Sequence, residues 1–233
     1  MFETLDINKR NLNLDLLRII AISAIILIHS SGGYLIYNSF NNGSHWWIVS
    51  VIYSSFFKWA SGVFVMLSGA FLLTEEKSND IWLFLKKRFI RIFIPFITWA
   101  LVYKILESPQ NIINLQPYML KNFIFDLYTG NVEYHLWFIY MISILYILTP
   151  IFSAIVHHPN KKLAYYFIAV WFILNFFPDY INKFMGLQIG SQYYLEITKY
   201  SGFYILGYML KDHLVKHKWF LFLGFMILSA INA

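Results

Sequence analysis

The sequence predicts an all-α fold, a polytopic bundle of transmembrane helices, and three features support this. Of the 233 residues, 59% are hydrophobic and only 13% are charged, which is far outside the range of soluble globular domains. Long apolar runs recur along the chain, and lysine and arginine gather in alternate connections between them. Such runs satisfy their backbone hydrogen bonds within helices that cross a lipid bilayer.

Seven apolar runs are candidate membrane spans, and together they predict one transmembrane domain over residues 1–233. They cover residues 14–31, 46–73, 89–106, 136–156, 163–178, 194–210 and 219–233. The last run ends at Ala233 and is shorter than the roughly 20 residues that a spanning helix needs. We therefore expect the C-terminal part of the domain to be missing.

Basic residues predict the orientation of the chain in the membrane. If successive connections alternate between the two sides, one side carries twelve lysines and arginines, and the other carries only Lys121 and Lys183. Basic residues collect on the cytoplasmic side, so the N-terminus is predicted to be cytoplasmic. The longest connection, residues 107–135, then lies on the opposite side. Its two prolines and one glycine favour a lid or a re-entrant segment.

Three ionisable residues lie within or at the start of the first apolar run, where charges are costly unless they are paired or face a polar cavity. Arg18 and His29 are eleven residues apart, which places them within about 20° of the same helix face and roughly 16 Å apart along the axis. Asp15 precedes Arg18 by three residues, a spacing that favours an ion pair. The alternative is an arginine that reaches toward the membrane surface beside an aspartate, with a histidine bonded to a neighbouring helix.

Five segments form a wider pattern in their order and spacing. They are Asn13–Arg18 with Ala21 and His29, Phe56–Phe57 with Gly62–Gly69, Lys86–Pro95, His135–Tyr140, and Leu145–Pro150. This pattern resembles the bacterial acyltransferase family 3, integral membrane enzymes that move acyl groups from acyl-coenzyme A onto sugars and other acceptors at the cell envelope. The resemblance covers most of the chain up to about residue 156 and implies a core of about ten spans, of which about seven are present here.

The resemblance and the chemistry of the side chains assign catalytic roles to Asp15, Arg18 and His29. His29 is the candidate general base for an attacking hydroxyl or, alternatively, a transient carrier of the acyl group. The permanent charge of Arg18 suits it to orient the pantetheine arm or to stabilise developing negative charge. Asp15 holds Arg18 in place.

Lys87, Arg88 and Arg91 are the candidate binding residues for coenzyme A. They lie, with Lys86, at the predicted cytoplasmic start of the third span, where guanidinium groups can bind phosphates in a bidentate manner. The alternative is a basic anchor that contacts anionic lipid headgroups. The resemblance favours acyl-coenzyme A.

The resemblance favours His135 and Trp137 as part of the acceptor pocket, and Glu133 is a further candidate. Glu133 and His135 precede the fourth span on the same predicted side of the membrane as His29. Lys58 is a further charge in the second run and either belongs to the site or lies near a displaced helix start. No metal centre is predicted, since His213 and His217 have no third ligand nearby.

These features predict a membrane O-acyltransferase of the bacterial cytoplasmic membrane. It would move an acyl group, most simply acetyl, from cytosolic acetyl-CoA to a hydroxyl of a surface polysaccharide or of its lipid-linked precursor. Acyl-CoA serves as co-substrate with no permanently bound cofactor, membrane lipids surround the protein, and nucleic acid is not a partner. A glycan transporter or flippase and an inactive, truncated homologue remain as alternatives.

Overall fold

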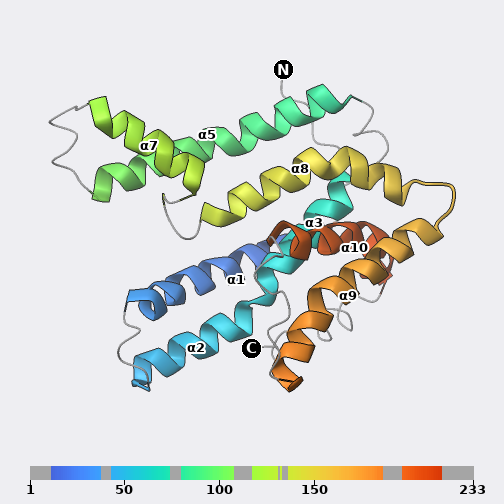
Figure 1. Cartoon of the computed structure of the whole chain (residues 1–233), viewed down its shortest axis with the longest axis horizontal. Coiled ribbons are helices and arrows are strands. Elements are labelled where there is room, and N and C mark those ends of the chain that lie inside the picture. Colours follow the sequence, from blue (N-terminus) through green and yellow to red (C-terminus); the bar gives the residue numbers. More distant parts are fainter. Residues whose placement is uncertain are drawn as a thin grey trace. The chain divides into compact units, whose positions relative to one another are not determined.

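The computed structural model describes residues 12–37, 43–73, 80–107, 117–130, 132, 136–185 and 196–216, and the regular structure within these ranges is helical (Figure 1). The helices are α1 (Leu12–Tyr37), α2 (His45–Phe57), α3 (Trp59–Leu72), α5 (Ile81–Glu107), α7 (Pro117–Thr129), α8 (Trp137–Val156), α9 (Lys162–Met185) and α10 (Glu196–Lys216). The chain divides into two compact units, Met1–Phe71 with Gly202–Ala233, and Leu72–Ser201.

The predicted all-α membrane fold is confirmed. Helices occupy six of the seven predicted runs, and the run from residue 219 lies outside the described residues. Within the described part of the chain, three segments are long and apolar enough to cross a membrane, namely His45–Leu72, Ile81–Leu106 and Trp137–Val156. Two details differ from the prediction: the second run is divided into α2 and α3 at Lys58, and the long connection after α5 contains the helix α7.

In the first unit, α1 packs along α2 and the start of α3. Ala24, Trp59 and Ala60 form a buried cluster, and Ile20 and Phe57 pack against it. Small residues on α1 let the two backbones approach closely, which is the usual way in which helices associate inside a membrane. The N-terminus of α2 is capped by the Ser44 hydroxyl, which accepts a hydrogen bond from the backbone N–H of Trp47 at 3.2 Å.

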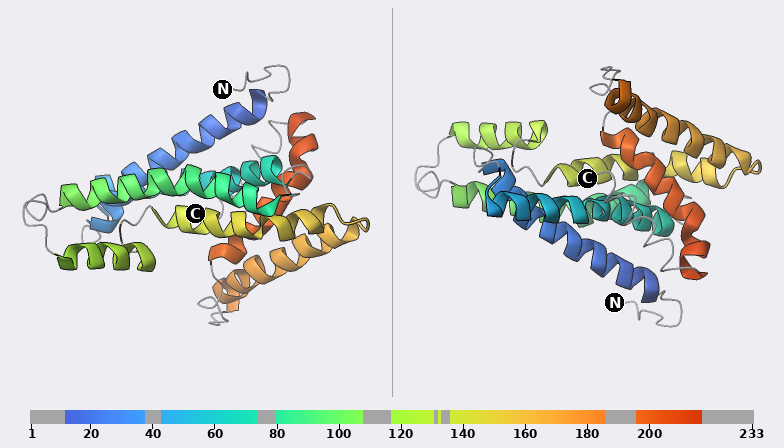
Figure 2. Two further views of the ribbon diagram at one scale, coloured as in Figure 1. Left: turned by 90° about the horizontal axis from the view of Figure 1, so that it is seen from above. Right: turned by 90° about the horizontal axis from the view of Figure 1, so that it is seen from below.

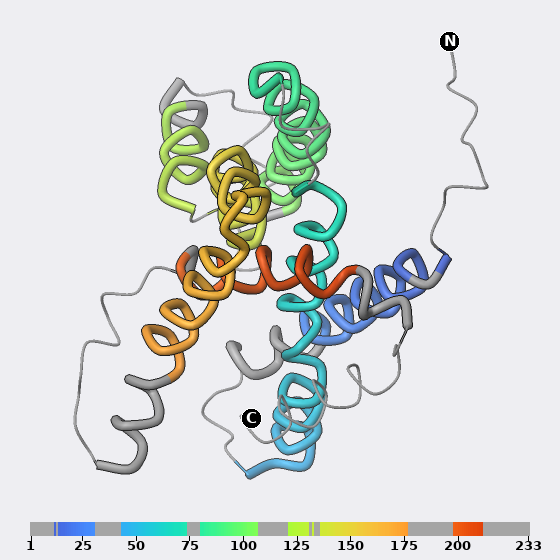
Figure 3. The backbone as a smooth tube through the Cα atoms, turned by 90° about the vertical axis from the view of Figure 1, so that its right-hand side faces the viewer, coloured from blue at the N-terminus to red at the C-terminus, as the bar shows by residue number. Residues whose placement is uncertain are grey.

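Two glycines in the first unit allow α3 and α10 to cross in backbone contact (Figure 3). A Cβ atom added to Gly69 would overlap the carbonyl of Tyr204, and one added to Gly207 would overlap the carbonyl of Met66. Tyr204 is fully buried at this crossing. The position of α10 on α3 therefore depends on the absence of two side chains.

In the second unit, α5 and α8 form a pair in which the ring of Phe96 meets the ring of Tyr140 edge to face, with centroids 5.3 Å apart. The pair is staggered: α5 continues past the start of α8, and α8 continues past the start of α5 (Figure 1). Helix α7 lies beside the overhanging end of α5 in both views of Figure 2. Trp171 of α9 donates from Nε1 to the carbonyls of Thr198 and Lys199, at 2.8 and 3.0 Å, and so holds the start of α10.

Candidate active site

Asp15 and Arg18 form the ion pair that their spacing predicts. Nη1 of Arg18 lies 3.5 Å from Oδ1 of Asp15, and both side chains are only partly exposed, Arg18 to 39% and Asp15 to 21%. His29 lies on the same uninterrupted helix. Because no break interrupts the helix between Arg18 and His29, their spacing of eleven residues places both on one face of α1.

Arg18 has a second contact that the sequence did not reveal. Its Cζ lies 4.5 Å from the ring centroid of Phe71, in the last turn of α3. An aromatic face attracts a guanidinium group, and the contact strengthens where water is excluded. Asp15 and Phe71 thus fix the charged group from two helices. The contact also brings the start of α1 next to the end of α3, as expected for two spans joined by a hairpin.

His29 lies at the edge of the surface that α1 packs against its neighbours. The buried residues of α1 include Ala21 and Ala24, while Ile22 and Ile26 are exposed. His29 is half-buried, like Asp15 and Arg18, and its Nδ1 atom is buried. The three ionisable groups thus follow the border between the packed and the exposed side of the helix, where a ligand could reach them without separating α1 from α2.

Helix α2 contributes polar side chains that the sequence analysis did not single out. Ser50 is buried and Ser54 is half-buried, whereas Ile52 and Tyr53 between them are exposed. The two serines are four residues apart and therefore lie on one face. The i,i+4 spacing of these two hydroxyl groups within an apolar run is the feature of the sequence that could have identified them. Helix α2 packs along α1, the helix that carries His29.

Lys58 lies in the middle of a membrane-spanning segment. It is the C-cap of α2 and is followed at once by α3, so it divides the segment His45–Leu72 into two nearly equal parts. Its side chain is exposed on the surface of the chain. A helix start thus follows Lys58 directly, and α2 and α3 extend for more than three turns on either side of it.

The basic residues of α5 lie beside the middle of α8. From the contact between Phe96 and Tyr140, Arg91 and Arg88 are displaced by about 8 and 12 Å along the helix axis. In that direction α8 continues from Tyr140 for about 24 Å, to Val156. Arg88 is half-buried with its Cζ 5.6 Å from the ring centroid of Phe84, whereas Lys86, Lys87 and Arg91 are exposed.

Trp137 is the only predicted acceptor residue within the described part of the chain. It begins α8, and its ring lies 5.8 Å from the ring of Tyr200 in α10, at an interplanar angle of 43°. Tyr200 is a neighbour that no local motif signalled. Glu133 and His135 lie outside the described residues.

The predicted catalytic residues belong to the first unit, whereas Lys87, Arg88, Arg91 and Trp137 belong to the second. Among the described residues, no group of three or more histidine or acidic side chains could hold a metal ion. The described groups can stabilise negative charge and move protons. They are the paired guanidinium of Arg18, the imidazole of His29, the ammonium of Lys58 and the basic side chains of α5.

Comparison with protein families matches the chain to an acyltransferase family. The model of acyltransferase family 3, described as an acyltransferase domain, matches residues 11–232. No curated protein and no solved structure matches the chain.

Proposed function

The chain belongs to acyltransferase family 3, and we propose that it is an O-acyltransferase that uses acetyl-CoA. In this proposal an acetyl group passes from cytosolic acetyl-CoA to a hydroxyl group of a cell-surface polysaccharide or of its lipid-linked precursor. The protein is a membrane acyltransferase by its family and by its helices. The donor, the acceptor and the bacterial cytoplasmic membrane as its location are part of the proposal, as is a cytoplasmic N-terminus.

The observation that carries the proposal is the arrangement of Asp15, Arg18 and His29 along one edge of α1. Each of these groups is costly within a membrane span unless it has a partner or a polar surrounding. Arg18 has both an ionic and an aromatic partner, so its charge is fixed in place. A fixed positive charge roughly 16 Å from an imidazole along the same helix face suits a site that holds an extended anionic ligand such as acyl-CoA along α1.

The acyl transfer itself can follow from these groups. A neutral imidazole of His29 takes the proton of the acceptor hydroxyl while the oxygen attacks the thioester carbon. The carbon–sulfur bond then breaks, and the coenzyme A thiolate leaves and regains a proton from the imidazolium. In a second route, His29 first accepts the acetyl group and then passes it to the hydroxyl. In both routes Arg18 orients the pantetheine arm, because its guanidinium group is held at Asp15 and lies too far along α1 from His29 to contact the same carbonyl oxygen.

We assign donor binding to Lys87, Arg88 and Arg91, and acceptor binding to Trp137 with Glu133 and His135. Guanidinium groups bind phosphates through two parallel hydrogen bonds, and coenzyme A carries phosphates on the cytosolic side. The rings of Trp137 and Tyr200, which are tilted toward each other, offer aromatic faces of the kind against which a sugar ring packs.

The proposal is tested by transfer of radiolabel from acetyl-CoA to envelope glycan, in membranes that contain the wild type, His29→Ala or His45→Ala. His45 is the matched control because it is an exposed histidine at the start of α2. We expect label in glycan with the wild type and the control, and none with His29→Ala. Full transfer by His29→Ala would exclude His29 from the mechanism. Uptake of unlabelled glycan without consumption of acetyl-CoA would instead indicate a transporter.

The donor site has its own test. We expect Arg88→Ala combined with Arg91→Ala to raise the KM for acetyl-CoA. Lys161→Ala combined with Lys162→Ala, which removes an exposed lysine from the connection between α8 and α9 and another from the first position of α9, should leave that KM unchanged. Equal effects of the two double variants would indicate that the cations of α5 act only as a membrane anchor.

A further inference from the structure

Helix α7 presents its apolar side chains outward. Ile124, Phe125 and Tyr128 are 56%, 61% and 87% exposed, whereas the charged side chain of Asp126 is only 23% exposed. A helix on the surface of a soluble protein shows the opposite pattern, with its apolar stripe toward the core. Helix α7 has 13 residues, which is too short for it to cross a bilayer.

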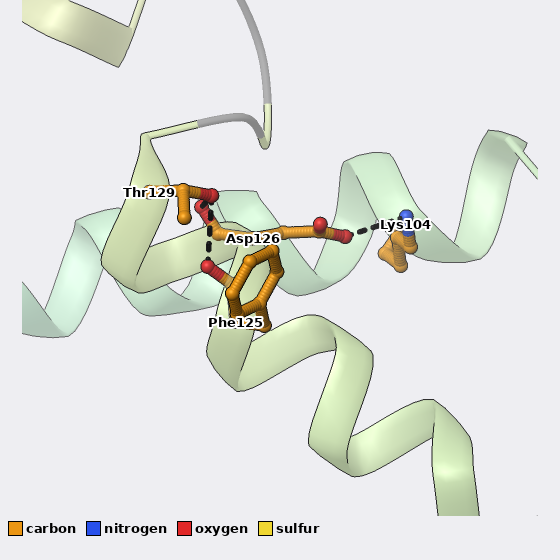
Figure 4. A network of polar contacts seen from close by, with 4 residues as sticks. All are labelled: Lys104, Phe125, Asp126 and Thr129. Atoms are coloured by element: carbon orange, nitrogen blue, oxygen red, sulfur yellow. Dashed lines mark hydrogen bonds and ion pairs between the residues drawn. The ribbon is translucent and has the colours of Figure 1, made fainter.

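The orientation of α7 is fixed by two contacts to its neighbours. Nζ of Lys104, near the end of α5, lies 3.0 Å from Oδ2 of Asp126 (Figure 4). The hydroxyl of Tyr140, in the first turn of α8, donates to the carbonyl of Leu127 at 2.6 Å. Phe123 is buried on this inward side. The inward side therefore holds both polar partners, and the apolar side cannot turn inward without breaking both contacts.

The two contacts also define the level of α7 relative to the membrane. Lys104 lies in the last turn of one membrane-spanning segment, and Tyr140 lies in the first turn of the next. Helix α5 ends and α8 begins on the same side of this helix pair, and α7 lies beside the part of α5 that continues past the start of α8. Helix α7 is thus held at the ends of two membrane-spanning segments.

The exposed apolar residues form one arc of the helix. At about 100° per residue, Ile124, Tyr128, Lys121 and Phe125 fall within an arc of about 100°, and all four are exposed. Lys121 lies between the aromatic residues on this arc. Its long aliphatic stem can lie along apolar surface while its ammonium group reaches phosphate.

We propose that α7 is an interfacial membrane helix whose Ile124, Phe125 and Tyr128 side chains insert among lipids at the boundary between headgroups and acyl chains. Amphipathic helices of this kind lie in the plane of the interface with aromatic and aliphatic residues directed into the lipid, and tyrosine is enriched at that depth. An aliphatic residue in the arc and the position at the ends of two spans favour lipid over a carbohydrate ligand. This inference is independent of the proposed acyl transfer.

The absence of cysteine from the chain allows a direct test, because a single introduced cysteine carries a spin label without background. We would place labels at Ile124→Cys, Phe125→Cys and Tyr128→Cys in full-length protein in vesicles of phosphatidylcholine and phosphatidylglycerol. Asn122→Cys is the matched control, since Asn122 is exposed on the same helix but lies about 100° from Lys121. Electron paramagnetic resonance measures how often each spin label collides with oxygen, which is concentrated in the lipid, and with a water-soluble nickel chelate. The ratio of the two collision rates reports the depth of the label in the membrane.

We expect the ratio of oxygen to nickel accessibility to be severalfold higher at the three arc positions than at Asn122→Cys. Equal ratios, or higher nickel accessibility on the arc, would overturn the proposal. So would protection of the arc that appears only when glycan is added, because this would indicate a carbohydrate surface. Crosslinking of the unaltered chain to a lipid with a diazirine near its ester group checks the same point, and the absence of crosslinks in α7 would contradict it.

Discussion

The contact between Lys104 and Asp126 leads to a quantitative prediction about how α7 is held. At the observed 3.0 Å, two unit charges attract by about 5 kcal/mol at an effective dielectric constant of about 20. The side chains keep 38% and 23% of their exposure, so hydration opposes most of that attraction. We expect a net coupling of about 1 to 2 kcal/mol, between the values typical of exposed and of buried pairs.

The measurement is a double-mutant cycle with Lys104→Met, Asp126→Asn and the double variant. The free energy of unfolding is obtained from titration with sodium dodecyl sulfate in mixed micelles, and the cycle isolates the pairwise energy. Asp15 and Arg18 supply a comparison: their 3.5 Å pair lies within one helix, for which we expect only about 0.2 to 0.5 kcal/mol. A coupling between Lys104 and Asp126 no larger than this would refute the reasoning that the pair ties α7 to α5.

Three further outcomes follow from the first unit. Replacement of Phe71 by leucine removes the ring beneath Arg18. It should weaken the fixation of Arg18, and with it the positioning of the acyl donor, by about 0.5 to 2 kcal/mol, seen as a fall in kcat/KM with little change in the unfolding temperature. Gly69→Ala places a methyl group against the carbonyl of Tyr204 and should destabilise the protein by about 1 to 3 kcal/mol, measured by detergent unfolding. Lys58→Met should preserve or raise stability, because it removes a mid-span charge; retention of full transferase activity would show that the ammonium group has no part in the reaction.

Sequence reasoning was strongest where a property repeats along the chain. The apolar runs predicted the helices because a backbone within lipid has no other way to satisfy its hydrogen bonds. The ion pair between Asp15 and Arg18 was predictable for a similar reason, since residues three apart are neighbours on any helix. The further contacts of this ion pair and the exposed fractions of its two side chains were not predictable.

Contacts between residues far apart in the sequence could not be predicted from the sequence alone. Nothing in the local sequence pairs Arg18 with Phe71, or Gly69 with Tyr204, because these contacts depend on how helices cross. Helix α7 was missed as a helix for another reason. Its apolar residues are exposed and its aspartate is directed inward, and the connection that contains it was predicted only to form a lid or a re-entrant segment.

The level of the α5 cations bears on what they do. An anchoring arginine is stabilised by leaving the hydrocarbon for the headgroups, but Arg88 and Arg91 lie beside the middle of α8, and Arg88 is half-buried over Phe84. Holding a guanidinium group within a span costs about 2.5 to 3.5 kcal/mol on insertion scales, and an anchor at that depth recovers none of it. An anionic ligand does, because each hydrogen bond to a charged group contributes about 1.5 to 3 kcal/mol. In the proposed donor site, the cations that are costly in the empty protein would become stabilising once phosphate is bound.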